Sequence, residues 1–289
     1  MRSLLVGAAG PVGQHLRQAL ADHDVIATFH SAPVQGGSHL DITDERATKE
    51  PIRSVRPDAV FLAAAEANVE RCEREPATTR RVSVDPVRAI VEEADSANAI
   101  MIALSSDYVF DGTKGRYVED DPVAPLNEYG RQKVELEGLV LSVPRNLVIR
   151  TSGVFGRDVS GKNFVLQFER TVRAGRPFAV PSDQLITPTY APSLARAVVQ
   201  LAERRATRLM HVAGPRILSR VEFAHMVCSA FGLATRSIVP TPTIELGLAA
   251  ARPRRAGLAD DRIRRLLGPL TDPEEALSEM SRGGFPHDR

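Results

Sequence analysis

The chain has 289 residues, of which 43% are hydrophobic and 25% are charged, and its formal net charge at pH 7 is +1. These fractions are those of an ordinary globular protein, and the balanced charge gives no reason to expect a nucleic acid or a membrane surface as a partner. Because the chain is long for one compact core, we expect a large domain with a smaller appended lobe.

Targeting and redox signals are weak in this sequence. No apolar run approaches the ~20 residues of a membrane span, and the N-terminus shows no signal-peptide pattern. Cys72 and Cys228 are far apart in the sequence and lie near no histidine cluster, which predicts two free thiols and no metal site. We therefore expect a cytoplasmic protein.

The first elements along the chain are a strand, a glycine-rich turn and a helix. Residues 2–6 are mostly apolar, Gln14–Ala21 has helical apolar spacing, and three glycines lie in the turn between them. In dinucleotide-binding folds such glycines let the backbone approach a pyrophosphate, which rests at the positive N-terminus of the helix. An ordinary tight turn is the alternative for a lone glycine pattern, but the position between a strand and a helix favours a cofactor site. The expected contacts are Gly7, Gly10, Pro11, Val12 and Gly13.

Apolar strands and amphipathic helices then alternate as far as residue 150. The strands are nearly all apolar, as expected for a parallel sheet that helices cover on both faces. This alternation predicts an α/β fold with a doubly wound parallel sheet, the Rossmann arrangement. The expected strands are Asp24–Phe29, Asp58–Ala64, Ala99–Leu104 and Leu147–Arg150, and the expected helices are Asp44–Val55, Pro76–Ala97 and Leu126–Leu141.

Ligands of such sheets bind beyond the carboxyl ends of the strands. The residues that follow the predicted strands should therefore line one crevice. They are Gly7, Ala63, Ala64, Ala65, Ser105, Ser106, Thr151 and Ser152.

The alternation loosens after residue 155. Ser219 and Glu222 fit a capping box that would start a helix over Ser219–Phe231. Further expected elements are the helices Asn163–Ala174 and Ala191–Glu203, a strand Leu209–Ala213 that rejoins the sheet, a loop Asp183–Tyr190, a loop over a pocket at Pro240–Arg255, and a frayed tail at Gly283–Arg289. We expect a dinucleotide-binding domain at 1–155, rejoined by 190–214, and a smaller C-terminal substrate-binding lobe at 156–189 and 215–289.

Tyr129 and Lys133 form the most informative pair in the chain. They lie four residues apart in a predicted helix, so their side chains leave the same face, and Ser106 ends a predicted strand upstream. A nearby ammonium favours the phenolate and so lowers a phenol pKa that is about 10 when unperturbed. A serine, a tyrosine and a lysine in this arrangement can relay a proton to a carbonyl group while a hydride moves. The alternative is an exposed helical pair with no chemical role.

The end of the second strand bears on cofactor choice. An acidic residue there would bond both ribose hydroxyls and select NAD. This chain has Phe29-His30-Ser31 instead, with no carboxylate to repel a 2′-phosphate. We expect NADP, with NAD as the second choice, and we expect His30 and Ser31 to contact it; an exposed loop histidine is the alternative for His30.

Basic side chains also occur outside the tyrosine–lysine helix. Arg252, Arg254 and Arg255 cluster on a proline-containing loop, where guanidinium forks would suit a diphosphate; a solvated surface cluster is the alternative. His211 and His225 have apolar sequence neighbours, which predicts packed and not catalytic side chains.

Several longer motifs carry a resemblance to a known family over nearly the whole chain. They are the glycine-rich turn, the run Ser105-Ser106-Asp107-Tyr108-Val109-Phe110-Asp111-Gly112, the run Pro125-Leu126-Asn127-Glu128-Tyr129-Gly130-Arg131-Gln132-Lys133, and then Arg150-Thr151-Ser152, Asn163-Phe164, Asp183-Gln184, Pro188-Thr189-Tyr190 and Arg252-Pro253. In this order they resemble the dTDP-4-dehydrorhamnose reductase group of extended short-chain dehydrogenases. They are also similar to a close relative, the regulatory beta subunit of methionine adenosyltransferase.

The resemblance implies NADPH- or NADH-dependent reduction of the 4-keto group of a nucleotide-linked deoxysugar. Ser106 would bond the substrate carbonyl, Tyr129 would donate the proton, and Lys133 would bind the nicotinamide ribose and hold the tyrosine pKa down. We also expect a homodimer. Further cofactor contacts would be Asp41, Ile42, Ala63, Ala64, Ala65 and Ser105, and the substrate contacts would be Ser106, Asp107, Tyr108, Val69, Gly153, Asn163 and Arg252. Capping the loop or orienting Ser106 is the alternative for Asp107, and packing is the alternative for Tyr108.

The chain also departs from the family pattern. Gly153 stands where the reductases usually carry an aromatic residue, often tryptophan, and the chain has no tryptophan. Ser83 stands where relatives commonly have asparagine. The run Ser105–Gly112 resembles the family's most distinctive signature, and its Ser-Ser-Asp form and the stretch 63–66 resemble the regulatory subunit more closely. Two alternatives therefore stay open: a non-catalytic NADP-binding regulatory subunit, and a reductase of another small ketone.

Overall fold

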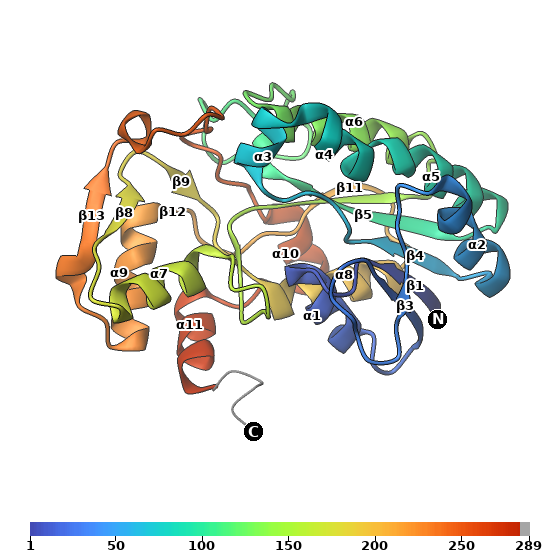
Figure 1. The fold of residues 1–289 in the computed structure, drawn as a ribbon, viewed down its shortest axis with the longest axis horizontal. Helices are drawn as coiled ribbons and strands as arrows, with labels where there is room; N and C mark the ends of the chain where they lie inside the picture. The colour runs from blue at the N-terminus through green and yellow to red at the C-terminus, as the bar shows by residue number, and fades with distance from the viewer. Residues whose placement is uncertain (284–289) are drawn as a thin grey trace.

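The structure, a computed structural model, describes residues 1–283 and contains one large parallel sheet. Its strands are β1 (Arg2–Val6), β2 (Asp24–Phe29), β3 (Ser38–His39), β4 (Ala59–Leu62), β5 (Ile100–Ser106), β6 (Leu147–Thr151) and β11 (Arg208–His211). They lie in the order β11-β6-β5-β4-β1-β2-β3, and every neighbouring pair is parallel (Figure 1). The order reverses direction at β1 and β4, which is the switch point of doubly wound folds. The expected fold class is confirmed.

Helices cover both faces of this sheet (Figure 1). On one face lie α1 (Pro11–Ala19), α8 (Ala191–Glu203) and the short α10 (Asp261–Leu267), whose apolar side chains share a core with β1 and β6. On the other face α2 (Glu45–Val55), α5 (Asp85–Ser96) and α6 (Glu128–Leu141) form a second core. Two short helices, α3 (Val69–Arg74) and α4 (Pro76–Ser83), lead into α5. The two apolar layers explain why the strands are apolar on both sides.

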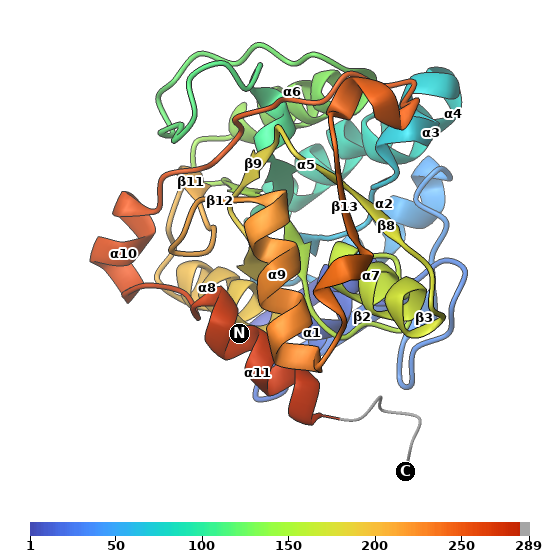
Figure 2. The ribbon, with the colours of Figure 1, turned by 90° about the vertical axis from the view of Figure 1, so that its left-hand side faces the viewer.

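A smaller lobe lies beside the sheet half, on the left in Figure 1, and faces the viewer in Figure 2. It is built from α7 (Phe164–Arg173), α9 (Arg220–Phe231) and α11 (Pro273–Arg282) around a separate core rich in phenylalanine. Short strands form three pairs in this part of the chain: β7 (Val154–Phe155) with β10 (Thr189–Tyr190), β8 (Phe178–Pro181) with β13 (Ile238–Thr241), and β9 (Leu185–Ile186) with β12 (Leu218–Ser219). The predicted capping box of Ser219 and Glu222 starts α9. The division at residues 155, 190 and 214 remains a proposal about domains.

Several sequence predictions about local structure need correction. The helix expected over 76–97 is broken at Val84 into α4 and α5, because Pro86 has no N–H to continue the helical bonds. The loop expected over Asp183–Tyr190 contains β9 and β10, whose pairing partners are distant in sequence. The strand expected over Leu209–Ala213 is β11, which begins one residue earlier and ends two residues earlier than predicted and pairs with β6. Of the predicted tail, residues 284–289 lie outside the described part.

The two histidines predicted to be packed differ from each other. His211 is fully buried against Phe110, and burial lowers its pKa to about 3. His225 is exposed, because it lies on the face of α9 away from its apolar core. The prediction is therefore confirmed for His211 and wrong for His225. Both cysteines are buried free thiols. Within residues 1–283, no helix combines the length and apolar character that a membrane crossing needs.

Candidate active site

The glycine-rich turn packs too closely for side chains. Gly7 has φ +92°, and a Cβ there would lie 2.6 Å from the backbone nitrogen of Ala64. A Cβ on Gly13 would lie 2.0 Å from the carbonyl oxygen of Gly7. The helix α1 begins at Pro11, so the N–H groups of Val12 and Gly13 in its first turn have no helical acceptor. A tight backbone cradle at a helix N-terminus fits a dinucleotide pyrophosphate.

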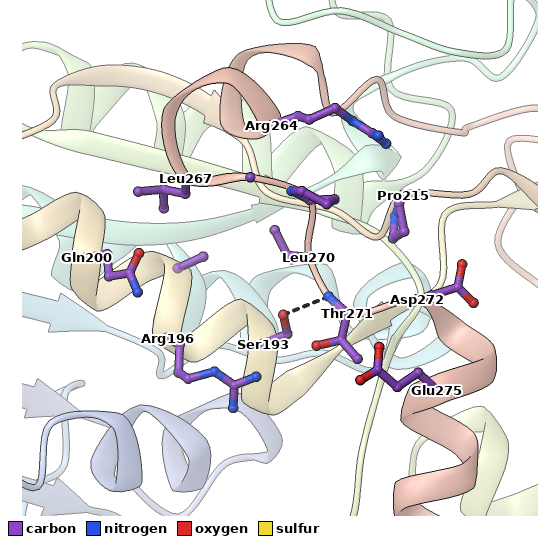
Figure 3. Close-up of a pocket in the computed structure, with 13 residues that line it drawn as sticks. Ser193, Arg196, Gln200, Pro215, Arg264, Leu267, Leu270, Thr271, Asp272 and Glu275 are labelled. Atoms are coloured by element: carbon purple, nitrogen blue, oxygen red, sulfur yellow. Dashed lines mark hydrogen bonds between the residues drawn. The ribbon is translucent and has the colours of Figure 1, made fainter.

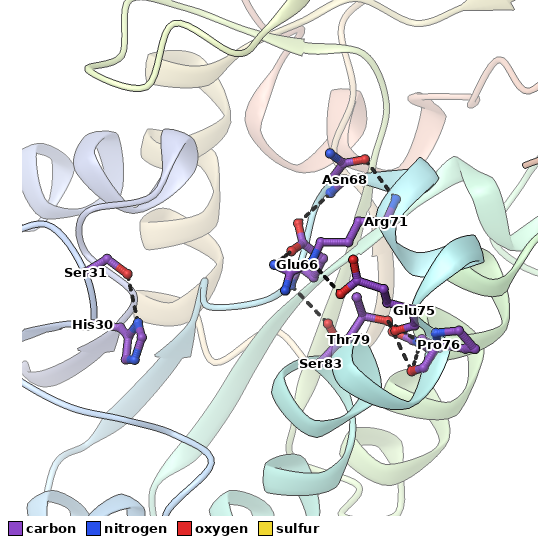
Figure 4. A network of polar contacts seen from close by, with 10 residues as sticks. His30, Ser31, Glu66, Asn68, Arg71, Glu75, Pro76, Thr79 and Ser83 are labelled. Carbon is purple, nitrogen blue, oxygen red and sulfur yellow. Dashed lines mark hydrogen bonds and ion pairs between the residues drawn. The ribbon is translucent and has the colours of Figure 1, made fainter. Parts of the chain in front are cut away.

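The residues expected near the adenosine half follow β2 and β3. His30 and Ser31 are both exposed, and His30 Nδ1 lies 2.9 Å from Ser31 Oγ (Figure 4). The Asp41 carboxylate accepts hydrogen bonds from the Thr43 hydroxyl at 2.7 Å and the Thr43 N–H at 2.9 Å, which lower the pKa of Asp41. Ile42 is buried. A turn with exposed polar groups and no acidic residue directly after β2 suits a 2′-phosphate.

The turn after β4 is held by polar contacts. Residues 63–65 are half-buried, and the Glu66 N–H donates to Ser83 Oγ at 3.0 Å, which ties the turn to the end of α4 (Figure 4). The Glu66 carboxylate pairs with Arg71 at 3.0 Å. Ser83, which departs from the family pattern, thus holds the backbone that borders Gly7. Val69 is the first residue of the neighbouring α3 and is half-buried.

The predicted catalytic side chains come together at the carboxyl end of β5. Ser106 ends β5, and Tyr129 lies in the first turn of α6, hydrogen-bonded to Ser106. Asn127 caps α6 by accepting from the Gly130 N–H at 2.9 Å. A Cβ on Gly130 would lie 2.2 Å from the Tyr108 carbonyl oxygen, so this glycine lets the helix approach the turn that follows Ser106.

Burial dominates the electrostatics of Tyr129 and Lys133. Burial raises the pKa of Tyr129, against the opposing effect of its Ser106 hydrogen bond. Lys133 Nζ donates to the Leu104 carbonyl at 3.0 Å and lies 5.7 Å from the centre of the Tyr129 ring. Burial lowers the pKa of Lys133 to about 8. Burial therefore outweighs any lowering of the Tyr129 pKa by Lys133 in this structure, and the phenol is protonated at neutral pH.

Ser105 belongs to a buried ion-pair network behind the site. Its hydroxyl donates to Glu137 Oε1 at 2.5 Å, and Arg150 donates to both oxygens of the same carboxylate, at 2.8 and 2.6 Å. The side chains of Arg150 and Glu137 are only 4% and 6% exposed. The Ser105 hydroxyl, predicted to contact the cofactor, is therefore used to join β5 to α6.

Asp107 is buried and does not line the crevice as an open carboxylate. Its Oδ1 accepts from Ser106 Oγ at 2.9 Å and its Oδ2 accepts from Ser152 Oγ at 2.6 Å. Burial raises the pKa of Asp107 to about 6. Of the roles considered for Asp107, the contacts favour orientation of Ser106.

Three of the predicted substrate residues, Arg252, Gly153 and Asn163, have different surroundings in the structure. Arg252, with a side chain 11% exposed, pairs with Glu70 at 2.7 Å and lies 5.9 Å from the Tyr108 ring centre. The positive φ of Gly153, +52°, explains a glycine there. Asn163 instead caps α7 and donates to the Gly156 carbonyl at 2.7 Å. Asn163 also borders a small recess together with Pro11, which places it towards the glycine-rich turn.

Sequence reasoning missed Glu70 and Arg220. Arg220 donates to the Gln184 side chain at 3.1 Å and is hydrogen-bonded to the Tyr108 hydroxyl. It occupies the first helical position of α9, where the helix dipole disfavours a cation. An arginine at this unfavourable position of a predicted helix could have identified Arg220 as a candidate functional residue from the sequence. Glu70 had no such signal, because its partner Arg252 is 182 residues away.

A further cavity lies away from the predicted site residues. Its volume is about 590 Å³, and it opens between α8 and the segment that joins α10 to α11 (Figure 3). Arg196, Gln200, Arg264 and Glu275 are among its lining residues, and no predicted site residue lines it. This cavity therefore has no part in the carbonyl site.

The sheet order, the glycine cradle and the serine–tyrosine–lysine arrangement define an NAD(P)-dependent oxidoreductase of the extended short-chain dehydrogenase/reductase type. The family model described as the RmlD substrate binding domain matches residues 1–283. The chain belongs to this family.

Individual relatives agree with this assignment. The chain is 31% identical to the dTDP-4-dehydrorhamnose reductase of Sinorhizobium fredii over 281 residues, which cover 93% of this chain and 92% of that protein. It is 31% identical to the Escherichia coli enzyme of the same name, over 89% of each chain. The crystal structure of dTDP-4-dehydrorhamnose reductase from Bacillus anthracis in complex with NADP has a TM-score of 0.88 and 27% identity, covering 96% of this chain and 98% of that chain.

Proposed function

We propose that the protein reduces the 4-keto group of a nucleotide-activated deoxysugar, with NADPH preferred over NADH. The observation that carries this proposal is the meeting of Ser106, Tyr129 and Lys133 at the sheet edge that also holds the glycine cradle. The relatives named as dTDP-4-dehydrorhamnose reductases and the NADP complex of one of them support the substrate class and the cofactor.

The residues of the chain supply the proton and the orientation. NADPH, when bound, supplies the hydride. Tyr129 is protonated at neutral pH because burial raises its pKa, so it can protonate the alkoxide that forms at C4. Lys133 has a pKa of about 8 and is mainly cationic at pH 7, which suits a hydrogen bond to the nicotinamide ribose. Gly7 and Gly13 would let the pyrophosphate lie close to the backbone.

The substrate would lie between the turn that follows Ser106 and the lobe. Arg252 and Arg220 both approach Tyr108, and two guanidinium groups at this position support a site for the nucleotide diphosphate. Gly153 contributes no aromatic side chain to the wall beside the sugar. A homodimer stays a separate prediction.

The test follows nicotinamide absorbance with purified protein, NADPH or NADH, and a panel of nucleotide-linked 4-keto-6-deoxysugars. We expect substrate-dependent oxidation that falls at least ~100-fold in Tyr129→Phe, with the Kd for NADPH nearly unchanged. Tyr117→Phe is the matched control, because that hydroxyl bonds Asp111 and not the site.

Two outcomes would count against the proposal. Unchanged turnover in Tyr129→Phe would contradict the role of the tyrosine. Tight NADPH binding without oxidation across the whole panel would favour either a reductase of another small ketone or a non-catalytic regulatory subunit. Stable co-purification with a synthetase is expected only for the regulatory subunit.

A further inference from the structure

The single hydroxyl proton of Ser106 is already used in the structure. Ser106 Oγ donates to Asp107 Oδ1 at 2.9 Å. The same oxygen accepts the Tyr108 N–H at 3.3 Å and is within hydrogen-bond reach of Tyr129. A serine hydroxyl has one proton to donate. While this proton is held by Asp107, Ser106 has none left to polarise a substrate carbonyl.

Among residues 1–283, the Asp107 carboxylate has two serine hydroxyl donors and no cation bonded to it. Its second oxygen accepts from Ser152 Oγ at 2.6 Å, and the side chain is 3% exposed. The charged or titratable groups that act on it are Arg220 from α9, Tyr129 from α6 and the adjacent Tyr108, each through space. Burial opposes its ionisation, and its pKa of about 6 puts protonation within reach near neutral pH.

The hydrogen bonds of Asp107 continue into the lobe. Ser152 Oγ accepts the Thr187 N–H at 3.2 Å, and Thr187 Oγ1 accepts the Leu258 N–H at 2.8 Å. Thr187 follows β9, and Leu258 follows the arginine-containing loop. The carboxylate is therefore joined both to the catalytic serine and to the segments that border the substrate side.

We propose that Asp107 is a positioning residue that sets the direction of the Ser106 hydrogen bond. As a carboxylate it holds the Ser106 proton, and Ser106 then presents its lone pairs to Tyr129. As a carboxylic acid, after taking one proton from solvent, it releases the Ser106 hydroxyl to donate to the substrate carbonyl. This role deepens the carbonyl reduction and rests on the proposed function.

The hydrogen-bond part of the proposal is tested without catalysis. Carbon-13 NMR of labelled aspartate carboxyl groups, assigned with Asp107→Asn, would give the pKa of Asp107 in the free protein. We expect Ser106→Ala and Ser152→Ala each to raise that pKa by about one pH unit, because each removes a donor to the charged form. Ser105→Ala is the matched control, since its hydroxyl bonds Glu137 instead. An Asp107 pKa that moves in neither variant would overturn the proposal.

The catalytic part is tested by the pH dependence of kcat/KM for the nucleotide-sugar substrate. We expect kcat/KM of the native enzyme to fall as pH rises through the Asp107 ionisation. Asp107→Asn should lack this limb, and Ser152→Ala should shift it about one unit higher. A limb that persists in Asp107→Asn at the same pH would overturn the proposal. If no substrate is turned over at all, the proposed function fails, whereas the NMR titration still decides the hydrogen-bond direction.

Discussion

The sheet half and the lobe hold their functional residues by different means. Ser106 ends a strand of seven residues, and Tyr129 and Lys133 lie on a helix of fourteen. In the lobe, Gln184 directly precedes the two-residue strand β9, and Arg220 directly follows the two-residue β12. Polar side chains, such as Gln184 bonded to Arg220 and Thr243, complete the connections there.

The sheet half holds the groups that would transfer the proton, and the lobe holds groups that would recognise the substrate. Long parallel strands and packed helices keep the proton-transfer groups in one geometry, which catalysis requires. Short strands joined by side-chain hydrogen bonds tolerate substitution more easily. The difference predicts that changes in the sheet half affect folding and cofactor binding, whereas changes in the lobe affect substrate affinity.

The largest effect should come from the ion pair behind the site. Glu137→Leu leaves Arg150 buried without its carboxylate, and we expect a loss of about 3–5 kcal/mol in the free energy of unfolding, measured by denaturant titration. Glu93→Gln is the control, because its partner Arg53 is 59% exposed, and it should cost no more than about 1 kcal/mol. Equal losses in the two variants would contradict the special role of the buried network.

The second prediction concerns the glycine-rich turn that would hold the pyrophosphate. Gly13→Ala places a Cβ 2.0 Å from the Gly7 carbonyl oxygen, so the turn must open. We expect the Kd for NADPH to rise about 10–100-fold, as for an overpacked site that costs 1–3 kcal/mol. Gly10→Ala has its nearest contact at 3.4 Å and should weaken binding less. Calorimetric titration would measure both, and equal affinities for native and Gly13→Ala protein would argue against this cofactor site.

A smaller effect tests the lobe side. Arg252→Lys removes a guanidinium fork that lies near Tyr108 and pairs with Glu70. We expect KM for the nucleotide sugar to rise about tenfold, with kcat and the Kd for NADPH changed little. Steady-state kinetics with Arg254→Lys as the control, an arginine 61% exposed, would show whether the effect is specific. If only the NADPH affinity changed, Arg252 would lie on the cofactor side of the crevice and the prediction would be wrong.

The smallest effect is a gain in stability. Gly138 lies in α6 with no atom within 4 Å of the Cβ position, so Gly138→Ala should stabilise the protein by about 0.5–1 kcal/mol in thermal unfolding. Gly130→Ala on the same helix should instead destabilise it, because its Cβ would lie 2.2 Å from the Tyr108 carbonyl oxygen. If both substitutions changed the stability in the same direction, the close approach of α6 to the turn that follows Ser106 would be contradicted.

Local sequence patterns predicted most of the regular elements. Asp24–Phe29 and Ala191–Glu203 were predicted with the bounds they have, and the capping box at Ser219 was predicted from two residues. Helix periodicity and strand hydrophobicity are local properties, so they can be recognised without the fold. The short β9 and β10 were missed because their stability comes from partners far along the chain.

The sequence by itself predicted the fold class, the family, and the meeting of Ser106, Tyr129 and Lys133 at one sheet edge, since the alternation of strands and helices and the four-residue spacing on one helix are local patterns. Only the tertiary structure decided the protonation of the site. Burial raises the pKa of Tyr129 where the sequence suggested a lowered one, and it isolates Asp107 with two serine hydroxyls. Desolvation depends on everything that packs around a group, and no short motif contains that information.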